Sequence, residues 1–239
     1  MISLFLMLAA TMPAAESQKF SSGETKTRLV ELYTSEGCSS CPPAEAWLGT
    51  LREAPGLWRD FVPVAFHVVY WDRLGWRDRF ASKAGTEREY AYADAWGSSS
   101  VYTPCFVQDG AEWRESFGRH APVAATEKVG VLSVECADDG ACRVNFTPMA
   151  GVSRADYDVH VAQLGGGITS PVRAGENEGR TLRHEFVALS LQHAKLANGS
   201  AELALTPVSI AGVTRRSLAV WVTRRGELAP VQATGGWLR

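Results

Sequence analysis

Apolar residues in the first half of the chain fall into blocks that predict alternating strands and helices. The runs at 28–34 and 61–70 are strand-like, and the second reads as largely buried because apolar residues dominate it without strict alternation. Each is followed by a stretch of helical composition, at 43–53 and at 82–96. This order predicts an α/β arrangement.

A hairpin closes the same half. Residues 101–108 predict a third strand, Asp109-Gly110 is a strong turn signal, and 111–117 returns as the partner strand. Residues 119–128 predict a last helix.

The pattern changes after about residue 130, where turn residues separate short β-rich runs. These runs lie at 131–136, 142–147, 157–164, 184–191, 201–206, 217–223 and 228–232. Strands at this spacing with little helix suggest a β-sandwich. We therefore expect two domains: a thioredoxin-like α/β domain over 28–128, for reasons given below, and a mainly-β, sandwich-like domain over 129–239.

The N-terminus has a different character. Residues 2–10 are apolar and are followed by Ala15-Glu16-Ser17, which resembles an export signal with a small-residue cleavage site. No Lys or Arg precedes the run, and an anchored N-terminal helix is the alternative. We expect a signal peptide over 1–17, a flexible leader over 18–27, and a periplasmic or secreted protein.

Composition narrows the function classes. The 239 residues carry a formal net charge of −2 and no basic stripe, so nothing favours nucleic-acid binding. No segment after the first reads as a membrane span. In an exported protein the five cysteines would meet an oxidising compartment, where disulfides persist.

Cys38-Ser39-Ser40-Cys41 is the motif with the most chemical content. It lies between a predicted strand and a predicted helix, and a helix start favours the thiolate that attacks in disulfide exchange. A static disulfide and a metal site are the alternatives. A zinc site usually takes two further ligands at matched spacing, and the chain has no second CxxC.

Thr103-Pro104 at the start of a predicted strand strengthens the redox interpretation. The order strand, CxxC, helix, strand, Thr-Pro strand and hairpin resembles the thioredoxin superfamily over 28–128. The resemblance implies a cis peptide bond before Pro104, and a loop that holds an extended peptide against the cysteines.

More narrowly, the chain is similar to a bacterial family of secreted thioredoxin-like proteins catalogued as domain of unknown function 1223. The similarity is carried by 31–44, by Phe66-His67-Val68, Tyr70-Trp71-Asp72, Gly75-Trp76 and Asp78, by 101–104, and by Gly175-Glu176-Asn177 with 179–182. These motifs run through both expected domains. The family implies a fold and no particular reaction.

The resemblance also assigns roles. Cys38 is expected as the nucleophile and Cys41 as the resolving thiol. With a one-residue gap, Glu31 matches the buried acid that shuttles protons near the resolving thiol, where burial would raise its pKa. An exposed glutamate on an edge strand is the alternative.

The aromatic turn after the second strand is a candidate substrate groove. Trp71 and Trp76, with Asp72 and Asp78, would line a peptide cleft beside the cysteines, although aromatic residues at this density also cap cores. His67 reads more readily as a core histidine than as a metal or proton site.

Cys105 admits three interpretations: a second resolving thiol, a metal ligand, or a small buried residue. With Cys38 and Cys41 it would make a three-sulfur site suited to Cu(I).

Cys136 and Cys142 flank a short turn, so a hairpin would bring them into a structural disulfide. Arg180 and His184 read as surface or interdomain residues without chemistry.

These observations predict an exported thiol–disulfide oxidoreductase that acts on a protein dithiol or disulfide and needs no cofactor. The alternatives are a Cu(I) chaperone using Cys38, Cys41 and Cys105, and a non-catalytic binding module.

Overall fold

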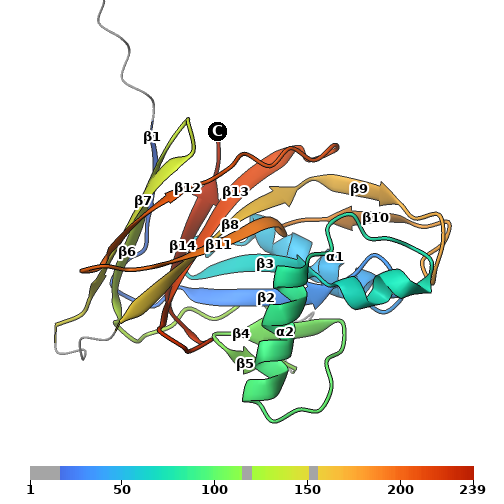
Figure 1. Cartoon of the computed structure of the whole chain (residues 1–239), viewed down its shortest axis with the longest axis horizontal. Helices are drawn as coiled ribbons and strands as arrows, with labels where there is room; N and C mark the ends of the chain where they lie inside the picture. The colour runs from blue at the N-terminus through green and yellow to red at the C-terminus, as the bar shows by residue number, and fades with distance from the viewer. Residues whose placement is uncertain (1–16, 115–119, 151–155) are drawn as a thin grey trace, which may run out of the picture.

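The computed structural model describes residues 17–114, 120–150 and 156–239 (Figure 1). Except for Ser17, the predicted signal peptide lies outside the described residues. None of the helices in these ranges is long and apolar enough to cross a membrane.

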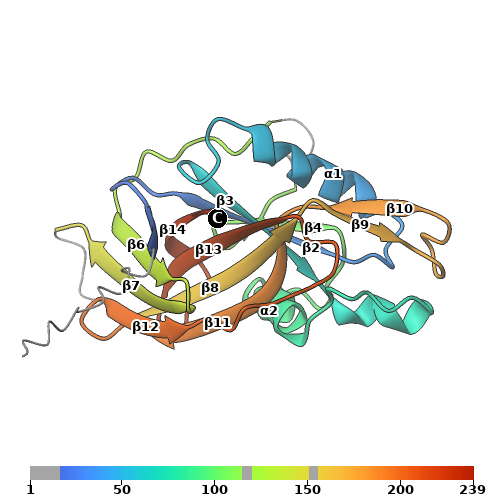
Figure 2. The same cartoon turned by 90° about the horizontal axis from the view of Figure 1, so that it is seen from above.

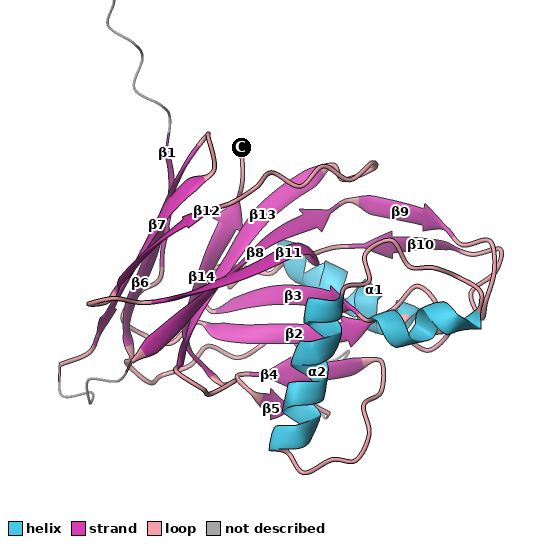
Figure 3. Ribbon diagram, in the orientation of Figure 1, coloured by secondary structure: helices cyan, strands magenta, loops and turns pink. Residues whose placement is uncertain are grey.

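The largest sheet has eight strands in the order β14-β13-β8-β11-β3-β2-β4-β5 (Figure 3). Its strands are β2 (Arg28–Thr34), β3 (Phe61–His67), β4 (Cys105–Gln108), β5 (Ala111–Glu112), β8 (Tyr157–Gly166), β11 (Val187–Lys195), β13 (Arg215–Arg224) and β14 (Pro230–Trp237). The turn of the first hairpin is confirmed, but its strands are shorter than predicted: β4 covers only the second half of the expected 101–108, and within the described part of 111–117 only β5 is strand. Asp109 and Gly110 have φ values of 52° and 88°, the positive angles that a two-residue hairpin turn requires.

Strands from both halves of the chain share this sheet. β3 pairs in parallel with β2 along its whole length and on its other side pairs with β11, where Val187 lies opposite Ala65. The Ala65 N–H also donates to the Phe186 carbonyl at 2.8 Å. One core cluster accordingly contains Phe66 together with Phe186 and Trp221.

The predicted fold class, a thioredoxin-like α/β domain followed by a separate sandwich, is therefore wrong. The chain is mostly β, and its main sheet crosses the boundary expected at residue 128. The physical reason is that β3 is buried along both edges as well as on both faces. Its apolar pattern predicts burial but does not say which strand covers the second edge.

The two α-helices in the described residues cover opposite faces of the sheet (Figure 2). Successive side chains of β2 point to opposite faces. Glu31 contacts Arg88 of α2 (Lys83–Ala95), whereas Thr34 contacts Glu45 of α1 (Pro42–Thr50). The short 3-10 helices η1 (Leu51–Glu53) and η2 (Val69–Leu74) follow α1 and β3.

A second sheet of four strands, ordered β1-β6-β7-β12, packs on the eight-stranded sheet. It consists of β1 (Ser17–Ser21), β6 (Gly130–Ala137), β7 (Ala141–Pro148) and β12 (Ser200–Ala204). Leu132 and Phe146 share a core cluster with Val159 and Val220 of the larger sheet. The segment expected to be a flexible leader thus begins as a strand paired with β6.

A small hairpin of β9 (Ile168–Pro171) and β10 (Thr181–His184) extends beside α1 (Figure 1). Sequence patterns did not resolve it because each strand has only four residues. The helix predicted at 119–128 is also wrong. Residues 120–128 have no helical turn, and Lys128 instead pairs with Thr25 in an isolated bridge.

Candidate functional site

The cysteine pair lies where β2 ends and α1 begins. Cys38 and Cys41 form a disulfide with an S–S distance of 2.10 Å, and Cys41 is the N-cap of α1. The carboxyl ends of the parallel strands β2 and β3 meet at this edge, which also places His67 at the site.

The helix start offers the disulfide fewer N–H groups than the motif alone suggests. Pro42 and Pro43 occupy the first two helical positions and have no N–H. The next two N–H groups, of Ala44 and Glu45, both donate to the Cys41 carbonyl, at 2.9 and 3.1 Å. None of the first four helical residues therefore has an N–H group free to donate to a cysteine sulfur.

Both cysteines are fully buried, with no exposed surface. The Ser40 hydroxyl lies 3.4 Å from Cys38 Sγ and 3.5 Å from the Thr103 carbonyl oxygen. Because Ser40 itself is exposed, Cys38 sulfur lies one side chain below the surface.

The Thr103-Pro104 loop lies against the disulfide, as predicted. The peptide bond before Pro104 is cis, and Cys38 Sγ is 3.8 Å from the Thr103 carbonyl oxygen. Trp71 donates from Nε1 to Thr103 Oγ1 at 2.8 Å. Trp71 and Trp76 are both half-buried, and each uses its indole N–H within the site.

The second half of the chain holds the cysteine loop in place. The Asn177 side-chain amide is completely buried and donates to the carbonyls of Glu36 and Cys38, both at 2.9 Å. The Glu176 carboxylate accepts from the Ser39 N–H at 3.1 Å. The sequence identified Gly175-Glu176-Asn177 only as a family motif. In the structure two of its residues bind the cysteine loop.

Glu31 is buried, but it is on the α2 face of β2 rather than the α1 face. Its carboxylate accepts from Arg88 at 2.6 and 3.1 Å, from Tyr92 at 2.7 Å and from Tyr33 at 2.9 Å. The carboxylate on the α1 side of the sheet belongs to Glu45. The proton-shuttle role assigned to Glu31 stays a prediction, and this geometry lends it no support.

Beside the cysteine loop is a buried group of carboxylates and imidazoles. Its members are Glu36, Glu45, His67, Asp78 and His184, each at most 6% exposed. His67 Nδ1 lies 2.6 Å from Asp78 Oδ2, and His184 contacts Glu45 through Nδ1 and Glu36 through Nε2. Trp76 donates to Glu36 Oε2 at 2.7 Å.

The carboxylates and imidazoles of this group shift each other's pKa values. Burial by itself would lower the pKa of His184, but the carboxylates of Glu45 and Glu36 raise it to about 10. Burial also acts to lower the pKa of His67, and the Asp78 carboxylate outweighs it and raises that pKa. The pKa of Glu45 is lowered because the two imidazoles outweigh its burial.

Sequence reasoning missed most of this group. His184 was expected at the surface or between the two domains, without chemistry; it is 1% exposed at the end of β10 and contacts Glu36 and Glu45 of the first half. No spacing rule links Glu45, His67 and His184, because three separate elements carry them. The signal available was the family motif ending at Leu182, two residues before His184.

Cys105 is a buried free thiol in β4. It lines a cavity of about 210 Å³ together with Glu89 and Tyr102, and burial raises its pKa to about 12. This environment disfavours the thiolate and fits a packing role.

The predicted Cys136–Cys142 disulfide is present, with an S–S distance of 2.00 Å, across the β6–β7 hairpin. It belongs to the four-stranded sheet and has no part in the site.

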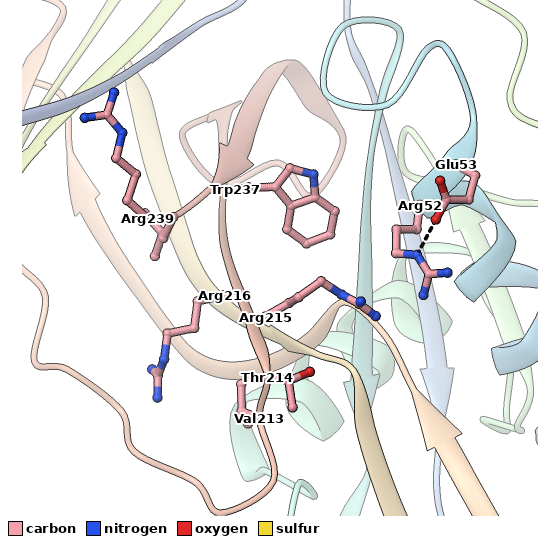
Figure 4. Close-up of a pocket in the computed structure, with 9 residues that line it drawn as sticks. Arg52, Glu53, Val213, Thr214, Arg215, Arg216, Trp237 and Arg239 are labelled. Carbon is pink, nitrogen blue, oxygen red and sulfur yellow. Dashed lines mark hydrogen bonds and ion pairs between the residues drawn. The ribbon is translucent and has the colours of Figure 1, made fainter.

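A separate arginine-lined cavity of about 550 Å³, which includes no residue of the site, opens between η1 and the end of β14 (Figure 4). Its arginines already have partners: Arg52 and Arg215 both contact Glu185 Oε1, and Arg216 donates to the Val208 carbonyl. The cavity therefore presents paired charges.

Comparisons place this architecture among proteins of solved structure. It is similar to protein AGR_C_4864 from Agrobacterium tumefaciens, with 26% identity and a TM-score of 0.63 over 90% of this chain and 95% of that one. It is also similar to HBP35 of Porphyromonas gingivalis, with 13% identity and a TM-score of 0.55 over 90% of this chain and 76% of that one. No curated protein matches the sequence.

The family described as "Protein of unknown function (DUF1223)" matches residues 29–223. The chain belongs to this family, as its motifs predicted. The match covers every residue of the candidate site.

Proposed function

We propose that the protein is an exported thiol–disulfide exchange protein whose reactive bond is Cys38–Cys41. The observation that carries the proposal is the position of that bond. It lies at the start of α1, with Cys38 Sγ 3.8 Å from the Thr103 carbonyl oxygen and one exposed serine above it.

The exchange runs in two balanced steps. A partner thiolate attacks Cys38 Sγ, which forms a mixed disulfide and releases Cys41 as a thiolate. The partner's second thiolate then attacks the partner sulfur that is bonded to Cys38, and Cys38 leaves as a thiolate. The partner dithiol is oxidised to a disulfide, the two cysteines are reduced, and the reverse sequence is equally available.

Burial sets a condition on this chemistry. Since neither cysteine has exposed surface, an attacking thiolate reaches Cys38 only after Ser40 moves away from the Thr103 carbonyl. Exchange is therefore expected to be slow with small thiols and faster with a partner that displaces Ser40.

The two prolines at the start of α1 affect the expected reduction potential of the Cys38–Cys41 disulfide. Because Pro42 and Pro43 remove two N–H donors from the helix start, the thiolate is less stabilised than at an ordinary start. We expect a reduction potential towards the reducing end of the range of exchange proteins, roughly −120 to −270 mV.

The test measures the potential of the Cys38/Cys41 couple against glutathione or dithiothreitol buffers, together with insulin reduction. The Cys136→Ser/Cys142→Ser variant is the matched control and should keep both properties. Cys41→Ser should trap a mixed disulfide at Cys38. The proposal fails if the reduced protein neither reduces nor oxidises any dithiol substrate, or if the potential lies far below the stated range, as for a structural disulfide.

The Cu(I) alternative remains untested and has no specific observation in its favour. Two of its sulfurs are joined to each other, and the third lines the cavity that holds Glu89.

A further inference from the structure

Three potential metal ligands converge behind the cysteine loop. Glu45 of α1, His67 at the end of β3 and His184 at the end of β10 each offer one donor atom, and the three atoms lie within 4.8 Å of one another. The residues are 6%, 1% and 1% exposed. Carboxylate oxygen and imidazole nitrogen are the donors that zinc-class ions take.

His67 has a free nitrogen at this point. Its Nδ1 is held by Asp78 Oδ2 at 2.6 Å, so Nε2 is the nitrogen left to bind a metal ion. That atom is buried and has no hydrogen-bond partner. Asp78 is itself fixed by the backbone N–H groups of Glu36 and Phe80, at 2.8 and 2.9 Å.

His184 and Glu45 are oriented in the same way. His184 Nδ1 contacts Glu45 Oε2, while Nε2 lies 3.2 Å from Glu36 Oε1. Thr34 donates to the other Glu45 oxygen at 2.8 Å. Each imidazole thus has one nitrogen against a carboxylate other than Glu45, Asp78 for His67 and Glu36 for His184. Carboxylates placed in this way orient histidine ligands in metal sites.

We propose that Glu45, His67 and His184 bind one divalent transition-metal ion of the zinc class. His67 would bind through Nε2, His184 through Nδ1 and Glu45 through a carboxylate oxygen, with Asp78 and Glu36 as the outer carboxylates. The ion would replace the direct contact between His184 Nδ1 and Glu45 Oε2. The carboxylates of Glu36, Glu45 and Asp78 are all buried here, and a bound ion would replace the imidazole protons as the positive charge that compensates them. This proposal does not depend on disulfide exchange.

Two clefts approach the group from either side. Glu45 lines a cleft of about 1050 Å³ between α1 and the β9–β10 hairpin, and Glu36 lines one of about 490 Å³ with Trp76 and Ser170. His184 contacts both glutamates. An ion therefore has a short path to the group once the Glu45 side chain moves.

The test is a titration of tag-free, chelator-treated wild-type protein with Zn²⁺, followed by calorimetry and by metal analysis after gel filtration. We expect one Zn²⁺ per chain. His67→Gln and His184→Gln should lose the bound ion, and Asp78→Asn should weaken binding roughly 10–100-fold. His193→Gln, at an exposed histidine of β11, is the matched control and should bind as the wild type does.

Co²⁺ provides a second measurement that needs no variant. Strong visible absorption from four-coordinate Co²⁺ in the wild type supports the site even if His184→Gln does not fold. The proposal is overturned if the wild type retains no Zn²⁺, if His67→Gln binds it as tightly as wild type, or if bound Co²⁺ shows only the weak absorption of an octahedral ion.

Discussion

The side-chain amide of Asn177 donates a 2.9 Å hydrogen bond to the backbone carbonyl of Cys38, 139 residues earlier in the chain. The same amide also satisfies the Glu36 carbonyl. A residue from the second half of the protein therefore determines the conformation of the loop that presents the disulfide.

Asn177→Ala should destabilise the protein and loosen this loop. It removes the amide's bonds to the Glu36 and Cys38 carbonyls and the bond that Asn177 Oδ1 accepts from Arg180. The Cys38 carbonyl keeps the Cys41 N–H, but the buried Glu36 carbonyl loses this donor, at a cost of about 1–3 kcal/mol. Urea unfolding should show the loss, and reduction of Cys38–Cys41 by dithiothreitol should be faster. Asn145→Ala, at an exposed position of β7, should change neither measurement.

Ser40→Gly should accelerate reduction of the Cys38–Cys41 bond. The Ser40 hydroxyl is the group between Cys38 sulfur and solvent, and glycine removes it. Stopped-flow reduction by a small phosphine is the measurement, with Ser39→Gly, at the adjacent exposed position, as the control. Equal rates in the two variants would show that Ser40 does not limit access.

Arg88→Met should be among the most destabilising single changes. It leaves the Glu31 carboxylate, which has no exposed surface, without its cation, and breaking a buried pair from one side typically costs about 3–5 kcal/mol. The double variant with Glu31→Gln should recover a large part of that loss. Chemical unfolding of the four proteins in the cycle tests this, and additive losses would contradict it.

The Glu89 carboxyl should make the protein less stable as the pH rises. Burial raises its pKa from 4.5 to about 8. Between these values the folded state binds the proton and the unfolded state has released it, so the free energy of unfolding falls with rising pH, by a few kcal/mol in all.

Glu89→Gln should remove this component and make the protein more stable than wild type above pH 8. Urea unfolding of both proteins from pH 4.5 to 9 is the measurement. Glu87→Gln, exposed on the same helix, should keep the wild-type slope. A difference between Glu89→Gln and wild type that does not vary with pH would contradict the assignment.

Local patterns in the sequence were sufficient for several parts of the fold. The apolar blocks predicted β2, β3 and both α-helices, and the Asp109-Gly110 and Cys136–Cys142 hairpins were placed correctly. Each depends on neighbouring residues alone, through side-chain alternation, turn geometry or a short loop between two cysteines.

Long-range pairing could not be predicted in the same way. The contact between Ala65 and Val187, which merges the two expected domains, joins strands more than a hundred residues apart, and many apolar strands would satisfy the pattern of β3 equally well. The burial of His184 could not be predicted for the same reason, since it depends on the hairpin that carries the residue to α1.

The sequence by itself determined the cysteine pair, the Thr-Pro loop beside it and the family, because these depend on residue identity and short spacings. Only the tertiary structure decided that one sheet unites the chain, that Glu31 faces α2, and that Glu45, His67 and His184 converge behind the disulfide. Those relationships depend on which distant segments share an edge or a face of the sheet, and side-chain patterns along the chain do not encode that choice locally.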